Sequence, residues 1–197
     1  MEIVMRQFYV FLISMVLSNQ MALAQPSHVS KYVGQENRPI KSLSQSDINQ
    51  LRKGAGWGLA KAAELNGVPG PLHILEMAEK IDLNTEQKSK IEAIYQSMKA
   101  KAIRLGNELI DKETQLNERF ANRTINQALL EQLVGEIAKI RAELRVVHLS
   151  THLQTPSILT EKQITLYNEL RGYKKDPCAH VPEGHNAQMW KMHNGCL

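Results

Sequence analysis

The spacing of apolar residues between Thr124 and Gln154 predicts a long helix with one apolar seam. The seam positions follow one another in alternating steps of three and four: Leu130, Leu133, Ile137, Ile140, Leu144, Val147 and Thr151. Such a repeat gives a narrow stripe that packs against a second helix in the manner of a coiled coil. Thr124 and Gln127 have the spacing of a capping box, which predicts the start, and Pro156 predicts the end.

A second long helix is predicted to begin at Thr85. Asn84 is a favourable N-cap, and Gln87 stands where a capping box requires it. Apolar residues then continue on one face at Ile91, Ile94, Tyr95, Met98, Ala102, Leu105, Leu109, Leu116 and Phe120. Lys112 interrupts this face, and Gly106 is expected to weaken the helix by roughly 1 kcal/mol relative to alanine. A turn at 121–123 would make the two helices a long antiparallel hairpin.

Shorter helices are expected on both sides of the hairpin. One begins at Ser44 or Ser46 and runs to about Asn66, with residues 54–58 read as a close helix approach or local break rather than a phosphate loop. Another spans 72–81, with Leu72, Leu75, Met77 and Ala78 directed inward. A last helix runs to about Tyr173 from a complete capping box, in which Leu159 packs on Ile164, Thr160 caps and Gln163 closes the box. No segment shows sustained strand alternation, so the predicted fold class is all-α.

The N-terminal segment has the features of an export signal. Residues 1–24 combine Arg6, a short apolar stretch and an A-x-A site ending at Ala24, after which cleavage is expected. An uncleaved anchor is the alternative. The remaining chain divides into a flexible lead at 25–43, a helical domain at 44–173 and a tail at 174–197 that contains Cys, His and Met. After cleavage the protein is expected to be exported and not embedded in a membrane.

Charge and motif content exclude several classes of function. The formal net charge is +4, but the charges are interspersed and form no basic stripe with aromatic residues, so nucleic acid is not an expected partner. The chain has no G-x-S-x-G or H-E-x-x-H motif and no α/β pattern that would build a pocket. We therefore expect no enzymatic activity, no catalytic residues and no required cofactor.

The two leucine-led capping boxes resemble the paired L-T-x-x-Q motifs of the Spy/CpxP family of periplasmic proteins. Leu159 to Gln163 matches the motif fully, and Leu83 to Gln87 matches it except that Asn84 replaces the usual Thr. The resemblance covers roughly residues 72–173. It implies a periplasmic homodimer of curved hairpins that either holds unfolded clients without ATP or takes part in metal-linked stress signalling.

Two histidines on the seam helix are candidate metal ligands. His148 and His152 are four positions apart, so both rings point the same way and suit one Zn, Ni, Co or Cu ion. The segment 147–152 also resembles the metal-sensing branch of the family. The alternative is a pair that packs or forms hydrogen bonds. A metal would need a third ligand, for which His73 or a second protomer is a candidate.

The tail offers a second set of soft ligands. Its candidates are His180, His185, Met189, Met192 and His193, which together favour Cu(I) or Zn. Cys178 and Cys196 either join this set as thiolates or form a disulfide, which an oxidising compartment permits. A disulfide here would contribute about 3 kcal/mol in the chain-entropy model.

Three functional hypotheses follow. In the first, the hairpin binds unfolded proteins on a face that mixes apolar groups with Arg104, Arg119, Arg141 and Arg145. In the second, the protein is a heavy-metal sensor or buffer that uses the helix pair, the tail or both. In the third, a dimeric adaptor docks on a membrane stress sensor. The client-binding hypothesis is preferred.

Overall fold

The computed structural model describes residues 28–173, 178 and 181–196. The predicted signal segment and His180 therefore lie outside the described residues. The chain divides into two compact units, at residues 1–36 and 37–197. The described part of the first unit is a short turn, and the 3-10 helix η1, Gln35–Asn37, contains the boundary between the units. Everything below concerns the second unit.

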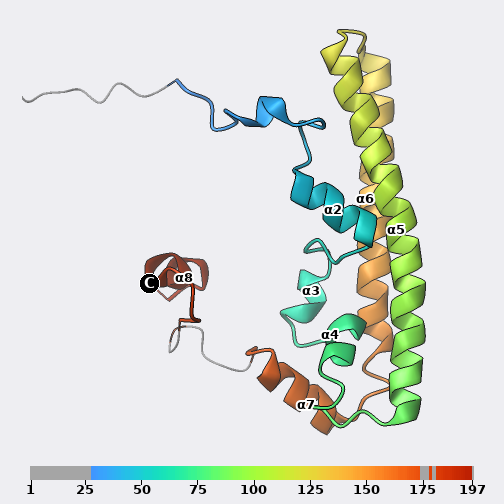
Figure 1. The fold of residues 1–197 in the computed structure, drawn as a ribbon, viewed down its shortest axis with the longest axis vertical. Coiled ribbons are helices and arrows are strands. Elements are labelled where there is room, and N and C mark those ends of the chain that lie inside the picture. The colour runs from blue at the N-terminus through green and yellow to red at the C-terminus, as the bar shows by residue number, and fades with distance from the viewer. Residues whose placement is uncertain (1–27, 174–177, 179–180, 197) are drawn as a thin grey trace, which may run out of the picture. The chain divides into compact units, whose positions relative to one another are not determined.

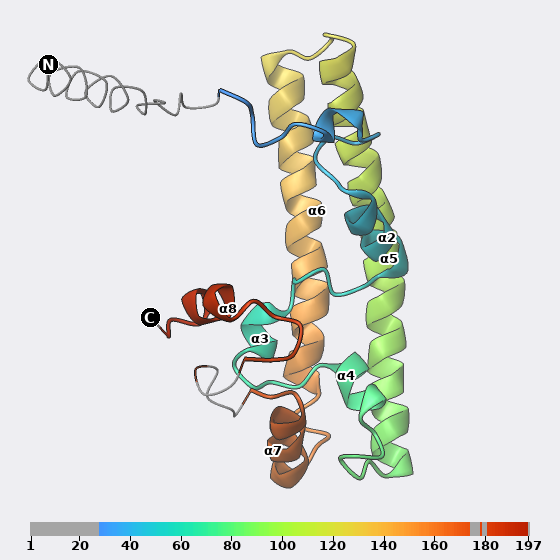
Figure 2. The same cartoon turned by 60° about the vertical axis from the view of Figure 1, so that its left-hand side comes forward.

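The predicted helical hairpin is confirmed. Helix α5, Thr85–Ala121, has 37 residues and α6, Gln127–Gln154, has 28, and they run antiparallel along their length (Figures 1 and 2). The predicted seam of α6 is the side that packs: Leu133, Ile137, Ile140, Leu144 and Thr151 are buried. Across the hairpin, Lys112 interrupts the apolar face of α5 but pairs with Glu136 of α6 at 2.7 Å. Helix α6 ends one residue before Thr155, as Pro156 predicts.

The start of α6 differs from the prediction. Its N-cap is Asn126, whose side chain accepts a hydrogen bond from the Leu129 amide, and not Thr124. Arg123 adopts a φ of 54°, so the chain turns sharply at the end of α5 and the first helical residue is delayed to Gln127. Asparagine ranks among the best N-cap residues, which makes the later start favourable.

The predicted helix from residue 44 to about Asn66 is also wrong in its extent. It is divided into α2, Gln45–Lys53, and α3, Lys61–Glu64. Gly54 ends α2 in the left-handed conformation, with a φ of 62°. Glycine adopts this conformation without the steric cost that other residues meet. A Cβ at Gly54 would also lie 3.0 Å from the Lys99 carbonyl oxygen, so the close approach and the local break coincide there.

Gly106 is required for helix packing, although glycine has a low helix propensity. A Cβ built there would lie 2.4 Å from the backbone oxygen of Leu51 in α2. The missing side chain therefore lets α2 lie directly on α5. The resulting cluster contains Leu51, Leu105 and Leu109, together with Ile40 and Leu43 from before residue 44. The packed part of the unit thus begins ahead of the predicted start of the domain.

A second apolar cluster joins α4, Pro71–Glu76, and α7, Glu161–Leu170, to the beginning of α5. Both helices are shorter than predicted, because α4 does not reach residue 81 and α7 does not reach Tyr173. The buried side chains here are Ile74, Ile81, Ile91, Leu159 and Tyr167, whereas Leu72, predicted to face inward, is 38% exposed. Phe120, at the other end of α5, is also exposed rather than part of the seam.

The tail forms a small disulfide-closed segment. Helix α8, Ala187–His193, lies between Cys178 and Cys196, whose sulfur atoms are bonded. This confirms the disulfide and excludes the thiolates as ligands in the oxidised chain. Among the described residues, no helix combines the length and apolar character needed to cross a bilayer.

Candidate functional site

The two leucine-led boxes have the same local geometry. Asn84 accepts a hydrogen bond from the Gln87 amide, and the Gln87 side chain accepts one from the Asn84 amide. Thr160 and Gln163 repeat this exchange at the start of α7. Each box thereby satisfies two backbone donors that a helix start leaves free.

The boxes are also bonded to each other through their glutamines. The Gln87 amide nitrogen donates to the Gln163 side-chain oxygen at 3.0 Å, and the Gln163 nitrogen donates to that of Gln87 at 3.1 Å. Each glutamine donates again to the carbonyl just before the other leucine: Gln87 to Ile158 at 2.8 Å and Gln163 to Asp82 at 3.0 Å. We call this reciprocal arrangement the glutamine clasp.

The clasp explains why the motif ends in glutamine. A glutamate at the same position would serve a capping box equally well, because the box needs an acceptor oxygen. The clasp also needs two N–H donors from each side chain, and a carboxylate has none. The two motifs are therefore one structural unit that fixes α7 against the start of α5.

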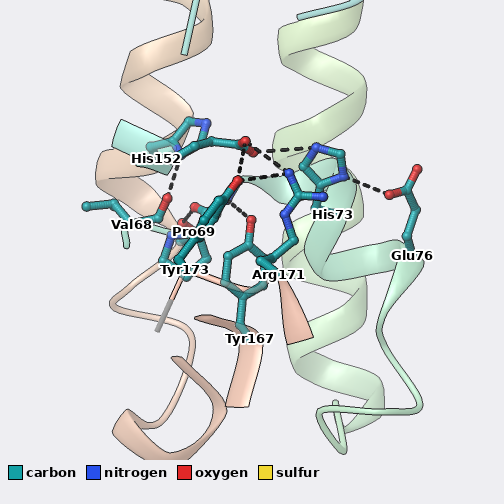
Figure 3. Close-up of polar contacts among 11 residues, drawn as sticks. Val68, Pro69, His73, Glu76, His152, Tyr167, Arg171 and Tyr173 are labelled. Atoms are coloured by element: carbon teal, nitrogen blue, oxygen red, sulfur yellow. Dashed lines mark hydrogen bonds and ion pairs between the residues drawn. The ribbon is translucent and has the colours of Figure 1, made fainter. Parts of the chain in front are cut away.

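A second set of side chains holds the turn at 67–70, which precedes α4. His152 bonds the Val68 carbonyl through Nδ1 at 2.9 Å, and Thr155 donates to the Pro69 carbonyl (Figure 3). From α7, the Tyr167 hydroxyl accepts a bond from the Gly70 amide at 3.4 Å. Burial raises the pKa of Tyr167 to about 12, so this phenol stays protonated at neutral pH. His152 thus has the hydrogen-bonding role that was the alternative to metal binding.

His73 belongs to a separate polar cluster (Figure 3). Its Nδ1 lies 2.7 Å from the Glu76 carboxylate, and its Nε2 lies 3.5 Å from Glu64. Glu64 also accepts hydrogen bonds from Arg171 at 3.1 Å and from Tyr173 at 3.0 Å. With both ring nitrogens next to carboxylates, His73 does not act as a third ligand for the helix pair in this conformation.

His148 borders an open cavity of about 500 Å³ between α4, α5, α6 and the loop after α2. The His148 side chain is buried, and among the described residues its Nε2 has no hydrogen-bond partner. Burial, and secondarily the nearby His152, lowers the pKa of His148, so the ring is neutral at pH 7. His152 and His73 border the same cavity.

The candidate metal ligands lie in two separate parts of the chain. Within the described ranges, no three His, Cys, Asp or Glu side chains are grouped closely enough to hold an ion. In the tail, His185, Met189, Met192 and His193 are exposed, and His185 lies edge-on to Trp190 with ring centres 5.0 Å apart. The structure thus places the helix pair in a cavity and the tail residues on a surface.

The four candidate arginines lie in different settings. Arg141 stacks over Trp57, with the guanidinium carbon 5.0 Å from the ring centre, and Arg104 pairs with Glu108 at 3.4 Å. Arg119 and Arg145 are exposed.

Sequence reasoning missed an apolar strip on the outer side of α6. Gly135, Ala138, Ala142, Val146 and Leu153 are all exposed, and Val146 and Leu153 are 64% and 81% accessible. At 3.6 residues per turn these positions share one face, opposite the buried seam. A second apolar periodicity was present in the sequence, but the stronger seam signal obscured it. We call these five residues the outer strip.

Comparison with known proteins supports the family suggested by the motifs. The pattern of the LTXXQ motif family protein matches residues 71–171, which run from the start of α4 to just beyond α7 and include the whole clasp. No curated protein and no solved structure matches the chain. The chain belongs to the LTXXQ motif family, the Spy/CpxP family of periplasmic helical proteins, whose members are non-enzymatic chaperone and stress proteins.

Proposed function

We propose that this protein is an ATP-independent periplasmic chaperone that binds unfolded segments on the outer strip of α6. The observation that carries the proposal is the exposure of this strip. A helix that is apolar on two sides normally buries both of them, whereas α6 buries one and leaves the other to solvent. Family membership supports the same class of function.

The surroundings of the strip suit an extended client. Arg145 and Lys139, both exposed, flank the strip on its two sides. Small residues at Gly135, Ala138 and Ala142 leave room for a peptide backbone to approach the helix closely. Apolar contact with flanking cations fits unfolded segments that carry apolar and acidic residues.

The proposal is tested by light scattering of a chemically denatured client diluted into the mature protein. We expect equimolar protein to suppress aggregation, and Val146→Asp combined with Leu153→Asp to abolish that suppression. Leu65→Asp is the matched control, because Leu65 is 66% exposed but lies outside the strip. Equal suppression by the strip variant and its parent would refute the assignment of the surface.

A homodimer remains a prediction of the resemblance, and the same variants test where it forms. Sedimentation equilibrium of the parent gives the oligomeric state. If the strip variant is monomeric while its parent is dimeric, the strip is the dimer interface and the client surface lies elsewhere.

We propose metal binding by the tail as a second function. The supporting observation is that Met189 and Met192 of α8 are 55% and 59% exposed, where methionine usually packs inside. With His185 and His193 they offer thioether and imidazole ligands, a set suited to Cu(I). Elemental analysis of protein from copper-supplemented cells should find bound metal that Met189→Leu with Met192→Leu removes. Metal-free parent protein would rule this function out.

A further inference from the structure

The cavity beside His148 has the size and the walls of a small-molecule site. Its volume of about 500 Å³ lies within the range of roughly 300–1,000 Å³ that is usual for such sites. Pro71, Leu72 and Met98 contribute apolar surface, and Gly54 and Gly56 present no side chain to the cavity. Neither the clasp nor the outer strip includes this cavity, so the functions proposed above leave it unexplained.

One polar atom of a residue that borders the cavity lacks a partner. His148 is 5% exposed, and its Nε2 has no hydrogen-bond partner among the described residues. Leaving a buried polar group unpaired costs about 1–3 kcal/mol. A neutral imidazole carries one N–H, and when the proton is on Nε2 this atom is a donor. Because Nε2 has less than 1 Å² of accessible surface, the ring turns toward the cavity when an acceptor there binds it.

The charges around the cavity favour an anion. Lys53 and Lys99 both border it, and the Lys99 ammonium lies 5.6 Å from the centre of the Tyr95 ring, which also borders the cavity. The acidic residue there, Glu64, is already neutralised by Arg171. The balance of charge available to a ligand is therefore positive.

We propose that this cavity binds a small organic acid with an apolar body. Its carboxylate accepts a hydrogen bond from His148 Nε2 and pairs with Lys53 and Lys99, while the body lies against Pro71, Leu72 and Met98. A transition metal fits the cavity less well, because among the described residues no third ligand of the His, Cys, Asp or Glu type joins the two imidazoles.

The test is isothermal titration of the mature, disulfide-bonded protein with naphthoate and with the uncharged analogue naphthylmethanol. We expect saturable binding of one naphthoate per chain, and binding of the alcohol weaker by at least about tenfold. Lys53→Gln combined with Lys99→Gln should weaken naphthoate binding by a similar factor. Lys88→Gln combined with Lys162→Gln, at exposed positions that do not line the cavity, is the matched control and should leave naphthoate binding unchanged.

A second measurement isolates His148. Its side-chain nitrogen chemical shifts should move when naphthoate saturates the protein, and His148→Phe should lose at least about tenfold in affinity. If His148→Phe fails to fold, the lysine variants and the chemical shifts still decide the matter. The proposal is overturned if naphthoate does not bind, if the alcohol binds equally well, or if the cavity instead takes up stoichiometric Zn²⁺ or Ni²⁺ that His148→Phe abolishes.

Discussion

Replacing Gln163 by glutamate separates the glutamine clasp from an ordinary capping box. In the parent, the Gln163 oxygen accepts from the Thr160 amide at 2.9 Å, and its nitrogen donates to the Asp82 carbonyl at 3.0 Å and to Gln87 at 3.1 Å. A carboxylate preserves the first contact and loses both donations. If α7 were capped in isolation, Gln163→Glu would be neutral, or stabilising by about 0.3–1 kcal/mol through the helix dipole.

The clasp predicts that Gln163→Glu instead lowers the free energy of unfolding. Each net hydrogen bond contributes about 0.5–1.5 kcal/mol, and two are lost. Gln163 is partly exposed, so water compensates some of the loss, and we expect a decrease of about 1–2 kcal/mol in the free energy of unfolding at pH 7. Two carbonyl oxygens facing the introduced carboxyl group raise its pKa in the folded state. The difference in the free energy of unfolding between parent and variant should therefore become smaller as the pH falls towards about 4, where the introduced carboxyl group takes up a proton.

Urea unfolding followed by circular dichroism measures this change. Gln45→Glu is the matched control, because Gln45 also lies in a first helical turn but its amide bonds an exposed neighbour, Asn49. A double-mutant cycle of Gln87→Ala and Gln163→Ala should give a coupling of about 0.5–1.5 kcal/mol. The reasoning is refuted if Gln163→Glu matches Gln45→Glu, or if the two alanine substitutions are additive.

Three further predictions concern the contact of α2 with α5, the buried His148 and the disulfide. Gly106→Ala should lower the free energy of unfolding by about 1–3 kcal/mol, because the added Cβ would meet the backbone of α2. Gly135→Ala is the control: this glycine faces open space, so the substitution should raise the free energy of unfolding by up to about 1 kcal/mol. Equal effects of the two substitutions in thermal unfolding would contradict the close approach of α2 to α5. Burial lowers the pKa of His148 in the folded protein, so below about pH 6.5 this imidazole takes up a proton more readily in the unfolded chain. The free energy of unfolding should therefore fall as the pH drops below about 6.5. Urea titrations at pH 5–7 measure this dependence, and His148→Gln should flatten it. Alkylation with mass spectrometry should find no thiol before reduction of the Cys178–Cys196 bond and two afterwards; two free thiols in untreated protein would contradict the bond.

The boundaries of the shorter helices were less predictable than the hairpin, for local reasons. Thr124 and Asn126 are both acceptable caps, and the left-handed turn at Arg123 decided between them. Gly54 ends α2 because its conformation and its contact with α5 coincide. Leu72 was expected to face inward from its apolar character, but Ile74 occupies the buried position once α4 starts at Pro71.

The sequence by itself determined the all-α class, the two long helices and the two leucine-led capping boxes, because heptad spacing and caps are local signals that act within one or two turns. Only the tertiary structure decided that the two boxes bond each other, since Gln87 and Gln163 are 76 positions apart. It likewise gave His152 a carbonyl partner at Val68, left His148 unpaired beside a cavity and exposed a second face of α6. Such contacts depend on which surfaces the packed helices bring together, and the sequence pattern of one segment does not specify which distant segment it will contact.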